Sequence, residues 1–202
     1  NTIVLFTSDN GCAHYIGVHQ LEAKGHHPSG PLRGYKSDTW EGGHRIPFIV
    51  RWPGVIAPDG VSNALIHQAD LLATVAEIIE IDLKPHEGED SFSLLSLLKG
   101  DTKDSPRSHS VSCSIRGVPS IRQGHWKLIP DAGSGGWSKG EVTTDLQLYR
   151  LDEDIGETEN LAPAFPGEIE QIKEMFETLI NRGRSTPGPR QKNDVEVKRY
   201  LN

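Results

Sequence analysis

Hydrophobic and polar positions along the first half of the chain follow two different periods. The run TIVLFT at residues 2–7 is β-branched and apolar on both faces, which is typical of a parallel strand covered by helices on either side. A second apolar run, IPFIVRW at residues 46–52, predicts another strand. Residues 70–81, DLLATVAEIIEI, instead have apolar residues at helical spacing and begin with Asp70, a candidate N-cap. The apolar face of this predicted helix consists of Leu71, Leu72, Val75, Ile78 and Ile79.

The second half of the chain changes to short strands followed by one helix. A short helix is predicted at residues 91–99, closed by Gly100. Short apolar runs separated by polar or glycine-rich turns predict a small antiparallel sheet, at residues 109–115, 118–123, 125–130 and 146–152. Residues 167–183 predict a helix that packs on this sheet and ends at Gly183. Its apolar stripe is Ile169, Ile172, Met175, Phe176, Leu179 and Ile180. The order strand, loop, strand, helix in the first half makes the expected fold class α/β.

Composition and charge narrow the choice of partners. With 202 residues and 35% hydrophobic content, the chain can bury a core. A net charge of −7 without clustered lysines or arginines argues against a nucleic acid partner. No apolar run approaches the roughly 18 residues of a membrane span. The chain has no signal-peptide pattern and no initiator methionine, and we expect further sequence to precede it. Cys12 and Cys113 leave both their pairing and the redox compartment open.

Candidate chemistry begins where the first predicted strand ends, at Asp9 and Asn10. Open α/β sheets bind ligands at the carboxyl ends of their strands, and a carboxylate beside an amide oxygen suits a hard cation such as Ca²⁺ or Mg²⁺. A turn explains the same residues, because Asp, Asn and Gly are common turn formers. Both interpretations remain open from these residues alone. The long aperiodic loop that follows, residues 9–45, is of a length that usually has a functional reason.

A second candidate stretch is PLRGYKSDTWEGGHRIPFIVRWPG, at residues 31–54. Gly42 and Gly43 permit close backbone approach, and Glu41 can pair with Arg45. Lys36 supplies a flexible positive charge suited to an oxyanion. Another charged group, Glu153, Asp154 and Glu157, follows the last predicted strand and is typical of a solvated turn.

These segments carry a resemblance to a known family. FTSDNG, followed by G-x-K-x3-W-E-G-G-x-R-x-P, resembles the sulfatase family of the alkaline-phosphatase-like superfamily. IRQGHWKLI and LQLYRLDEDIGETENLA are similar to the C-terminal subdomain of that family. The resemblance implies the C-terminal part of a mixed-sheet α/β sandwich, followed by a small antiparallel sheet with one packed helix. It places the catalytic part at residues 1–105 and the small subdomain at residues 106–202.

The same resemblance implies roles for individual residues. Asp9 and Asn10 would be ligands of a divalent metal, calcium first and magnesium second. Related phosphatases and phosphodiesterases that hold two zinc ions tend to have Asp-His here, whereas an amide oxygen is a poor zinc ligand. Lys36 would be a catalytic residue that contacts the sulfate oxygens of the substrate. His14, the histidine nearest the metal pair, is a candidate substrate contact.

The family's nucleophile is a formylglycine made from Cys or Ser in a C/S-x-P-x-R motif. Cys12 is followed by AHYI and Cys113 by SIRG, so neither cysteine has the required proline and arginine. We therefore find no such motif in this chain and expect the nucleophile upstream of it. The expected function is a sulfuric ester hydrolase, of which this chain alone is inactive.

Two alternatives stay open: a phosphodiesterase or phosphonate hydrolase of the same superfamily, and a non-catalytic module that binds sulfated glycans. The expected partners are a sulfated small molecule or carbohydrate and the missing N-terminal portion of the same protein. The resemblance also implies a periplasmic, extracellular or lysosomal location.

Overall fold

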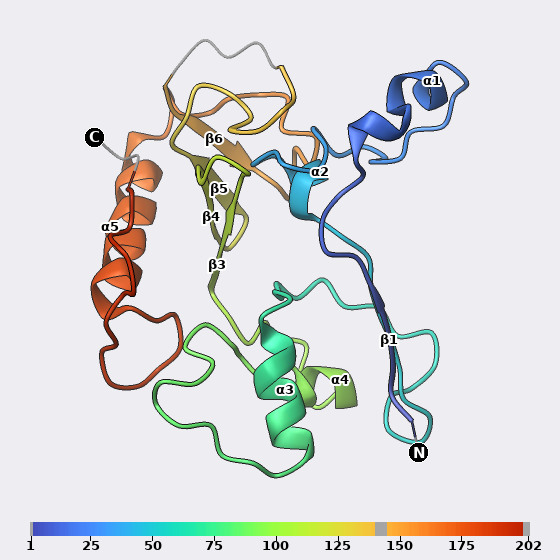
Figure 1. Cartoon of the computed structure of the whole chain (residues 1–202), viewed down its shortest axis with the longest axis vertical. Helices are drawn as coiled ribbons and strands as arrows, with labels where there is room; N and C mark the ends of the chain where they lie inside the picture. Colours follow the sequence, from blue (N-terminus) through green and yellow to red (C-terminus); the bar gives the residue numbers. More distant parts are fainter. Residues whose placement is uncertain (1, 140–144, 200–202) are drawn as a thin grey trace. The chain divides into compact units, whose positions relative to one another are not determined.

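The computed structural model describes residues 2–139 and 145–199, which form two compact units. One unit comprises residues 2–5, 50–110 and 173–198, and the other comprises residues 6–49, 111–172 and 199, apart from the gap. The short helical segments are η1 (His14–Ile16), α1 (Val18–Glu22), α2 (Glu41–His44) and α4 (Leu95–Lys99), and the longer helices are α3 (Asp70–Ile78) and α5 (Pro166–Arg182) (Figure 1). The strands are β1 (Val4–Thr7), β2 (Phe48–Arg51), β3 (His109–Cys113), β4 (Pro119–Gln123), β5 (Trp126–Ile129) and β6 (Gln147–Arg150). The predicted division near residue 105 stays a prediction.

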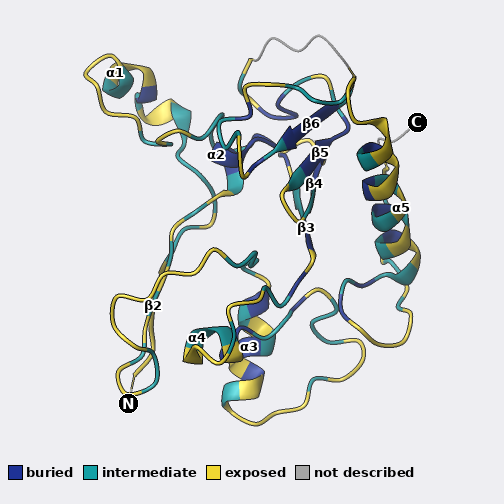
Figure 2. Cartoon of the chain, turned by 180° about the vertical axis from the view of Figure 1, so that it is seen from behind, coloured by how far each residue is buried: buried dark blue, intermediate teal, exposed yellow. Residues whose placement is uncertain are grey.

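Strands β3 to β6 form a four-stranded sheet in sequence order, which confirms the predicted small sheet. Strands β4 and β5 pair antiparallel, with Ile121 opposite Leu128. Strands β5 and β6 also pair antiparallel, with Leu128 opposite Leu148. These three side chains are fully buried, and Figure 2 shows buried residues concentrated along these strands. A core cluster of the same unit consists of Trp40, Val118, Ile129, Tyr149 and Leu151.

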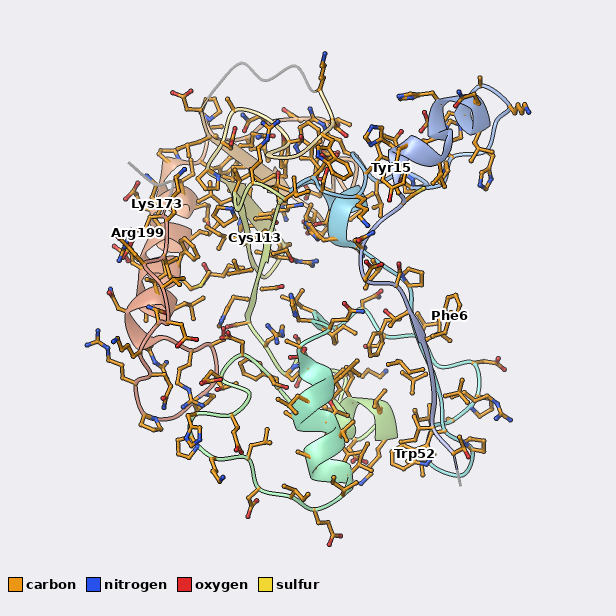
Figure 3. All side chains as sticks on the ribbon, in the orientation of Figure 1. Phe6, Tyr15, Trp52, Cys113, Lys173 and Arg199 are labelled. Atoms are coloured by element: carbon orange, nitrogen blue, oxygen red, sulfur yellow. The ribbon has the colours of Figure 1, made fainter. Side chains whose placement is uncertain are left out.

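The predicted strands near residues 2–7 and 46–52 are present, but the expectation that the first is covered on both faces is wrong within this chain. Strands β1 and β2 form a two-stranded sheet of their own. Val4, Leu5 and Phe6 are exposed, and the ring of Phe6 projects from the strand (Figure 3). Strand β1 pairs only with β2 among the described strands. Its apolar side chains are therefore exposed to solvent in this chain.

Helix α3 is present where predicted, but it buries a different face. Leu72, Val75 and Ile79 are about half exposed, whereas Asp70 and Thr74 are buried. The polar face of α3 is buried because Asp70 and Thr74 accept hydrogen bonds from the backbone of residues 92–94. The hydroxyl of Thr74 accepts a hydrogen bond from the Leu94 amide at 2.9 Å.

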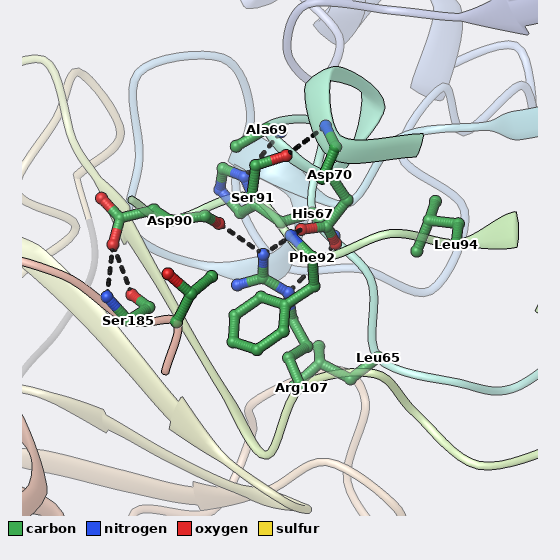
Figure 4. Close-up of polar contacts among 12 residues, drawn as sticks. Leu65, His67, Ala69, Asp70, Asp90, Ser91, Phe92, Leu94, Arg107 and Ser185 are labelled. Carbon is green, nitrogen blue, oxygen red and sulfur yellow. Dashed lines mark hydrogen bonds and ion pairs between the residues drawn. The ribbon is translucent and has the colours of Figure 1, made fainter. Parts of the chain in front are cut away.

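Asp70 is not the N-cap of helix α3, because Ala69 occupies that position. Its carboxylate instead accepts hydrogen bonds from the Phe92 amide at 3.0 Å and from Nε of Arg107 at 3.1 Å (Figure 4). The Arg107 guanidinium also donates to the carbonyl oxygen of Asp90 at 2.9 Å. Both charged side chains are buried and paired, so this contact anchors the start of α3.

Helix α5 agrees with the predicted stripe and end. Ile169, Ile172, Phe176 and Ile180 are buried. The chain leaves the helix at Gly183, which has φ +61° and donates its amide to the carbonyl of Leu179 at 2.9 Å. Glycine adopts this left-handed conformation at no steric cost, which is why it ends the helix. No helix in the described part of the chain is long and apolar enough to cross a membrane.

Candidate functional site

Backbone hydrogen bonds join the two candidate stretches of the sequence, which are Asp9 with Asn10 and residues 31–54. The Gly11 amide, directly after Asn10, donates a hydrogen bond to the Gly43 carbonyl at 2.9 Å. The Lys36 amide donates to the Cys12 carbonyl at 2.8 Å. The turn at the end of β1 is therefore fixed both to the segment that carries Lys36 and to helix α2.

Close backbone contact explains the glycines of both stretches. A Cβ atom on Gly11 would lie 1.7 Å from the carbonyl oxygen of Gly42. A Cβ atom on Gly42 would lie 2.2 Å from the carbonyl oxygen of Gly34. Any side chain at either position would collide with main chain, which cannot move aside as a flexible side chain can. The predicted close approach at Gly42 is confirmed.

Asp9 and Asn10 offer oxygen donors at the edge of this junction. Asp9 is exposed and Asn10 is half-buried. The Asn10 amide nitrogen donates to the Gly11 carbonyl at 2.8 Å, which leaves its side-chain oxygen available to a cation. Within residues 2–139 and 145–199, no cluster of three or more His, Cys, Asp or Glu side chains could hold a metal ion. Asp9 and Asn10 have the oxygen atoms that calcium prefers, but they supply only some of its ligands. Their role as metal ligands stays a prediction.

Lys36 is held by its backbone and not by its side chain. Its amide is bound to Cys12, while no hydrogen bond or ion pair joins its ammonium group to another described residue. The next residue, Ser37, has φ +87°, a left-handed conformation that costs free energy for a residue other than glycine. This strained residue directly follows Lys36, whose ammonium has no partner among the described residues.

Asp38 joins residues 35–38, which we call the Lys36 segment, to the loop after β5. Its buried carboxylate accepts hydrogen bonds from the amides of Tyr35 at 2.9 Å, Trp137 at 3.1 Å and Ser138 at 3.1 Å. The Ser138 hydroxyl donates to the same carboxylate. A buried carboxylate with this many donors is well satisfied, so it fixes the geometry of both segments.

His14, the predicted substrate contact, lies among aromatic rings. Its ring centroid is 5.9 Å from that of Trp137, in an edge-on arrangement, and 6.4 Å from that of Tyr35. Its Nδ1 atom is buried and makes no hydrogen bond to any described residue. Nothing in these contacts tests the predicted role of His14, which stays a prediction.

Beneath helix α2 lies a buried network of charges centred on Lys127 of β5. The Lys127 ammonium, which is fully buried, lies 2.9 Å from Oε1 of Glu41 and 2.8 Å from Oε1 of Glu157. The Glu41 amide donates to Oε2 of Glu157 at 2.6 Å. Arg45 donates to Oε2 of Glu41 at 3.0 Å, which confirms the predicted pair. This network joins the W-E-G-G stretch to strand β5 and to the segment after β6.

The two carboxylates of this network differ in their pKa. Burial by itself would raise the pKa of Glu41, but Lys127, His44 and Arg45 outweigh it and lower the pKa to about 2. Burial raises the pKa of Glu157 above its ordinary value, although Lys127 opposes the shift. One ammonium therefore holds two buried carboxylates, and Glu41 is the one that is firmly ionised.

Sequence reasoning missed this network. The expectation that Glu157 lies in a solvated turn is wrong, because the residue is fully buried with φ +53°. It escaped notice because its neighbours Glu153 and Asp154 are charged, and local composition does not show which one turns inward. The signal that could have found Lys127 is its place inside the apolar strand HWKLIP, where a lysine needs a partner.

One match to the C/S-x-P-x-R pattern does occur, at Ser29-Gly30-Pro31-Leu32-Arg33, so the expected absence of the motif holds only for the cysteines. The structure gives its residues other contacts. Arg33 lies over the Trp40 ring at 3.8 Å and donates to the Glu157 carbonyl at 2.9 Å. The Ser29 hydroxyl donates to the Gly34 carbonyl at 3.2 Å. These residues pack the loop, and both cysteines of the chain are unpaired.

The chain is similar in sequence to known proteins over most of its length. The family model described as Sulfatase matches residues 1–81. The chain is 35% identical over 190 residues to an N-acetylgalactosamine-6-O-sulfatase of Bacteroides thetaiotaomicron. It is 32% identical over 197 residues to human arylsulfatase A. These matches cover 90% and 88% of the chain, and 37% of each relative.

The fold of the chain is also similar to that of a solved structure. A structure from work on the metabolism of multiple glycosaminoglycans by Bacteroides thetaiotaomicron superimposes with a TM-score of 0.77 at 34% identity. The match covers 89% of this chain and 38% of that protein. The α/β fold is thereby shown, and the chain spans less than two-fifths of the length of these relatives.

Proposed function

Because this chain belongs to the sulfatase family, we propose that the complete protein is a sulfuric ester hydrolase. The observation that supports the proposal best is the junction of the two stretches. The backbone hydrogen bonds from Gly11 to Gly43 and from Lys36 to Cys12 join the segment that carries the oxygen-donor pair to the segment that carries Lys36. A sulfate ester carries negative charge on its oxygens, and both a cation and an ammonium group stabilise that charge.

Within this proposal Lys36 binds the sulfate oxygens and stabilises the charge that grows there during hydrolysis. Its ammonium has no partner among the described residues, so it is free to bind an anion. The buried pair of Lys127 with Glu41 holds helix α2, while Asp38 holds the Lys36 segment. Fixed supports of this kind keep a charged group where the transition state needs it.

Asp9 and Asn10 would hold a calcium ion, with magnesium as the second candidate, together with ligands from outside this chain. A bound divalent ion would supply positive charge to the sulfate oxygens. The donor set supports this assignment, since carboxylate and amide oxygens suit hard cations.

Replacing Asp9 by alanine in the complete protein is expected to weaken calcium binding. Losing even a group that only orients a metal ligand costs about 10- to 100-fold in affinity, so we expect at least this loss. Calorimetric titration with calcium chloride measures it, and Asp82→Ala, an exposed aspartate of the other unit, is the matched control. Unchanged affinity in Asp9→Ala would place the calcium site elsewhere.

The nucleophile is proposed to lie outside this chain. A formylglycine would supply the hydrated aldehyde oxygen that attacks sulfur. The 202-residue chain by itself is therefore expected to show no turnover of 4-nitrophenyl sulfate above the buffer rate. Turnover that disappears in Ser29→Ala would show that the nucleophile is the serine of the internal motif, and would overturn this part of the proposal.

The function itself is tested with the complete protein on 4-nitrophenyl sulfate and N-acetylgalactosamine 6-sulfate. We expect release of inorganic sulfate from at least one of them. The proposed substrate is a sulfated small molecule or carbohydrate. The proposed structural partner is the remaining portion of the same protein. Family resemblance is also the support for a periplasmic, extracellular or lysosomal location.

A further inference from the structure

An exposed aromatic surface lies beside the Lys36 segment. Tyr15 is 65% exposed and Trp137 is 42% exposed, and their ring centroids are 6.1 Å apart with the planes tilted by 59°. Tyr15 belongs to the short helix η1, where Figure 3 labels it. His14 lies edge-on to Trp137 at 5.9 Å. We call these three side chains, Tyr15, Trp137 and His14, the aromatic platform.

The platform is fixed to the residues next to Lys36. The Trp137 amide donates hydrogen bonds to Oγ of Ser37 and to Oδ1 of Asp38, both at 3.1 Å. Because the Asp38 carboxylate is buried and also bound to Ser138, the backbone on either side of the Trp137 ring is held in place. A large indole is thus kept exposed on a fixed loop, although water contact with its surface costs free energy. Exposed aromatic side chains that lie together on a fixed loop are typical of a ligand-binding surface.

The geometry of the platform indicates what it binds. Two rings tilted by 59° form an open, angled surface and not a parallel slot, so a flat aromatic ligand could stack fully on only one of them. A sugar ring has an apolar C–H face and a rim of hydroxyl groups. The exposed ring faces of Tyr15 and Trp137 suit the C–H face, and the open angle between them leaves the hydroxyl rim in contact with water.

We propose that the aromatic platform binds the sugar ring of a sulfated carbohydrate whose ester sulfate lies at Lys36. This inference rests on the proposed function, because it assigns the non-sulfate part of the same substrate. Trp137 and Tyr15 are specificity residues in this assignment, and they take no part in the attack on sulfur. Rigid aromatic side chains supply contact area at a small cost in conformational entropy, which suits them to this task.

The test compares Trp137→Ala and Tyr15→Ala in the complete protein on two esters. For N-acetylgalactosamine 6-sulfate we expect kcat/KM to fall about tenfold or more, as for truncation of a well-packed aromatic contact. For 4-nitrophenyl sulfate, whose single flat ring can stack on only one of the two side chains, we expect a clearly smaller loss than for the sugar ester. The matched control is Phe165→Ala, an aromatic residue of the same unit that is 41% exposed and lies 5.1 Å from Trp126. Its activity on both esters should be unchanged, and Trp137→Phe should restore part of the sugar activity.

An equal loss on both esters in Trp137→Ala would mean that the indole only supports the Lys36 segment, and would overturn the proposal. An unchanged kcat/KM on the sugar ester would overturn it as well. If the complete protein hydrolyses neither ester, the proposed function fails, and calorimetric binding of N-acetylgalactosamine 6-sulfate then decides about the platform. Weaker binding in Trp137→Ala than in wild type and Phe165→Ala supports it, whereas equal affinity or no binding to the wild type overturns it.

Discussion

Replacing Lys127 by methionine is expected to destabilise the complete protein by about 3–5 kcal/mol, the usual cost of removing one partner from a buried ion pair. The change leaves the carboxylates of Glu41 and Glu157 buried without their shared ammonium. Methionine keeps most of the volume, so lost packing contributes little. Denaturant unfolding followed by tryptophan fluorescence measures the change in the free energy of unfolding.

The loss of stability in Lys127→Met should depend on pH, in a direction that follows from the pKa shifts of Glu41 and Glu157. Glu41 has a folded pKa of about 2 against an ordinary value of 4.5, so its stabilisation is present above 4.5 and lost as the pH falls through about 2. Glu157 has a raised pKa, so its contribution is present below 4.5 and declines as the pH rises through the folded pKa. Without Lys127 both carboxylates are protonated more easily. The stability deficit of Lys127→Met should therefore be smaller at about pH 5 than at about pH 8.

Two comparisons isolate the network. Lys24→Met removes an exposed lysine from the same unit and should leave stability within about 0.5 kcal/mol of the wild type. Adding Glu157→Gln to Lys127→Met should recover part of the loss, because one buried charge disappears. A Lys127→Met protein as stable as Lys24→Met at every pH would show that the network does not form.

Replacing Lys36 by alanine in the complete protein is expected to lower the hydrolysis rate about 10²–10³-fold, the usual loss on removing one preorganised group that stabilises transition-state charge. The ammonium has no partner among the described residues, so its removal should hardly affect the fold. Steady-state kinetics on 4-nitrophenyl sulfate measure the effect, beside the melting temperature of each variant.

Arginine at this position should rescue the rate only in part, because its planar group is larger and directs its donors differently. Lys24→Ala, an exposed lysine of the same unit, should keep the wild-type rate. A near-normal kcat/KM in Lys36→Ala, with an unchanged melting temperature, would return Lys36 to the ordinary role of a solvated loop residue.

Local patterns predicted the short strands and helix α5 well. Alternating runs between polar turns gave β3 to β6, and the stripe from Ile169 to Ile180 gave the helix with its end at Gly183. These elements depend on neighbouring residues in the sequence, which a pattern records directly. The resemblance named Asp9, Asn10, Lys36 and His14 as site residues, and the structure brings the first three onto segments joined by backbone hydrogen bonds.

The failures concern contacts between distant parts of the chain. Helix α3 was expected to bury its apolar face, yet Asp70 turns inward because Arg107, far along the sequence, supplies its partner. Glu157 is buried for the same reason, through Lys127. Neither partner can be read from the residues around the carboxylate. Tyr15 and Trp137 are likewise far apart in the sequence, and Trp137 is held near Lys36 by its contacts with Ser37 and Asp38.

The most direct test of the central claim is the ratio of kcat/KM for 4-nitrophenyl sulfate to that for 4-nitrophenyl phosphate, measured on the complete protein. A sulfatase should hydrolyse the sulfate ester and favour it clearly over the phosphate ester. A clear preference for the phosphate ester would contradict the account and support a phosphodiesterase or phosphonate hydrolase. Binding of sulfated sugars without hydrolysis of either ester would contradict it too, and would support a glycan-binding module.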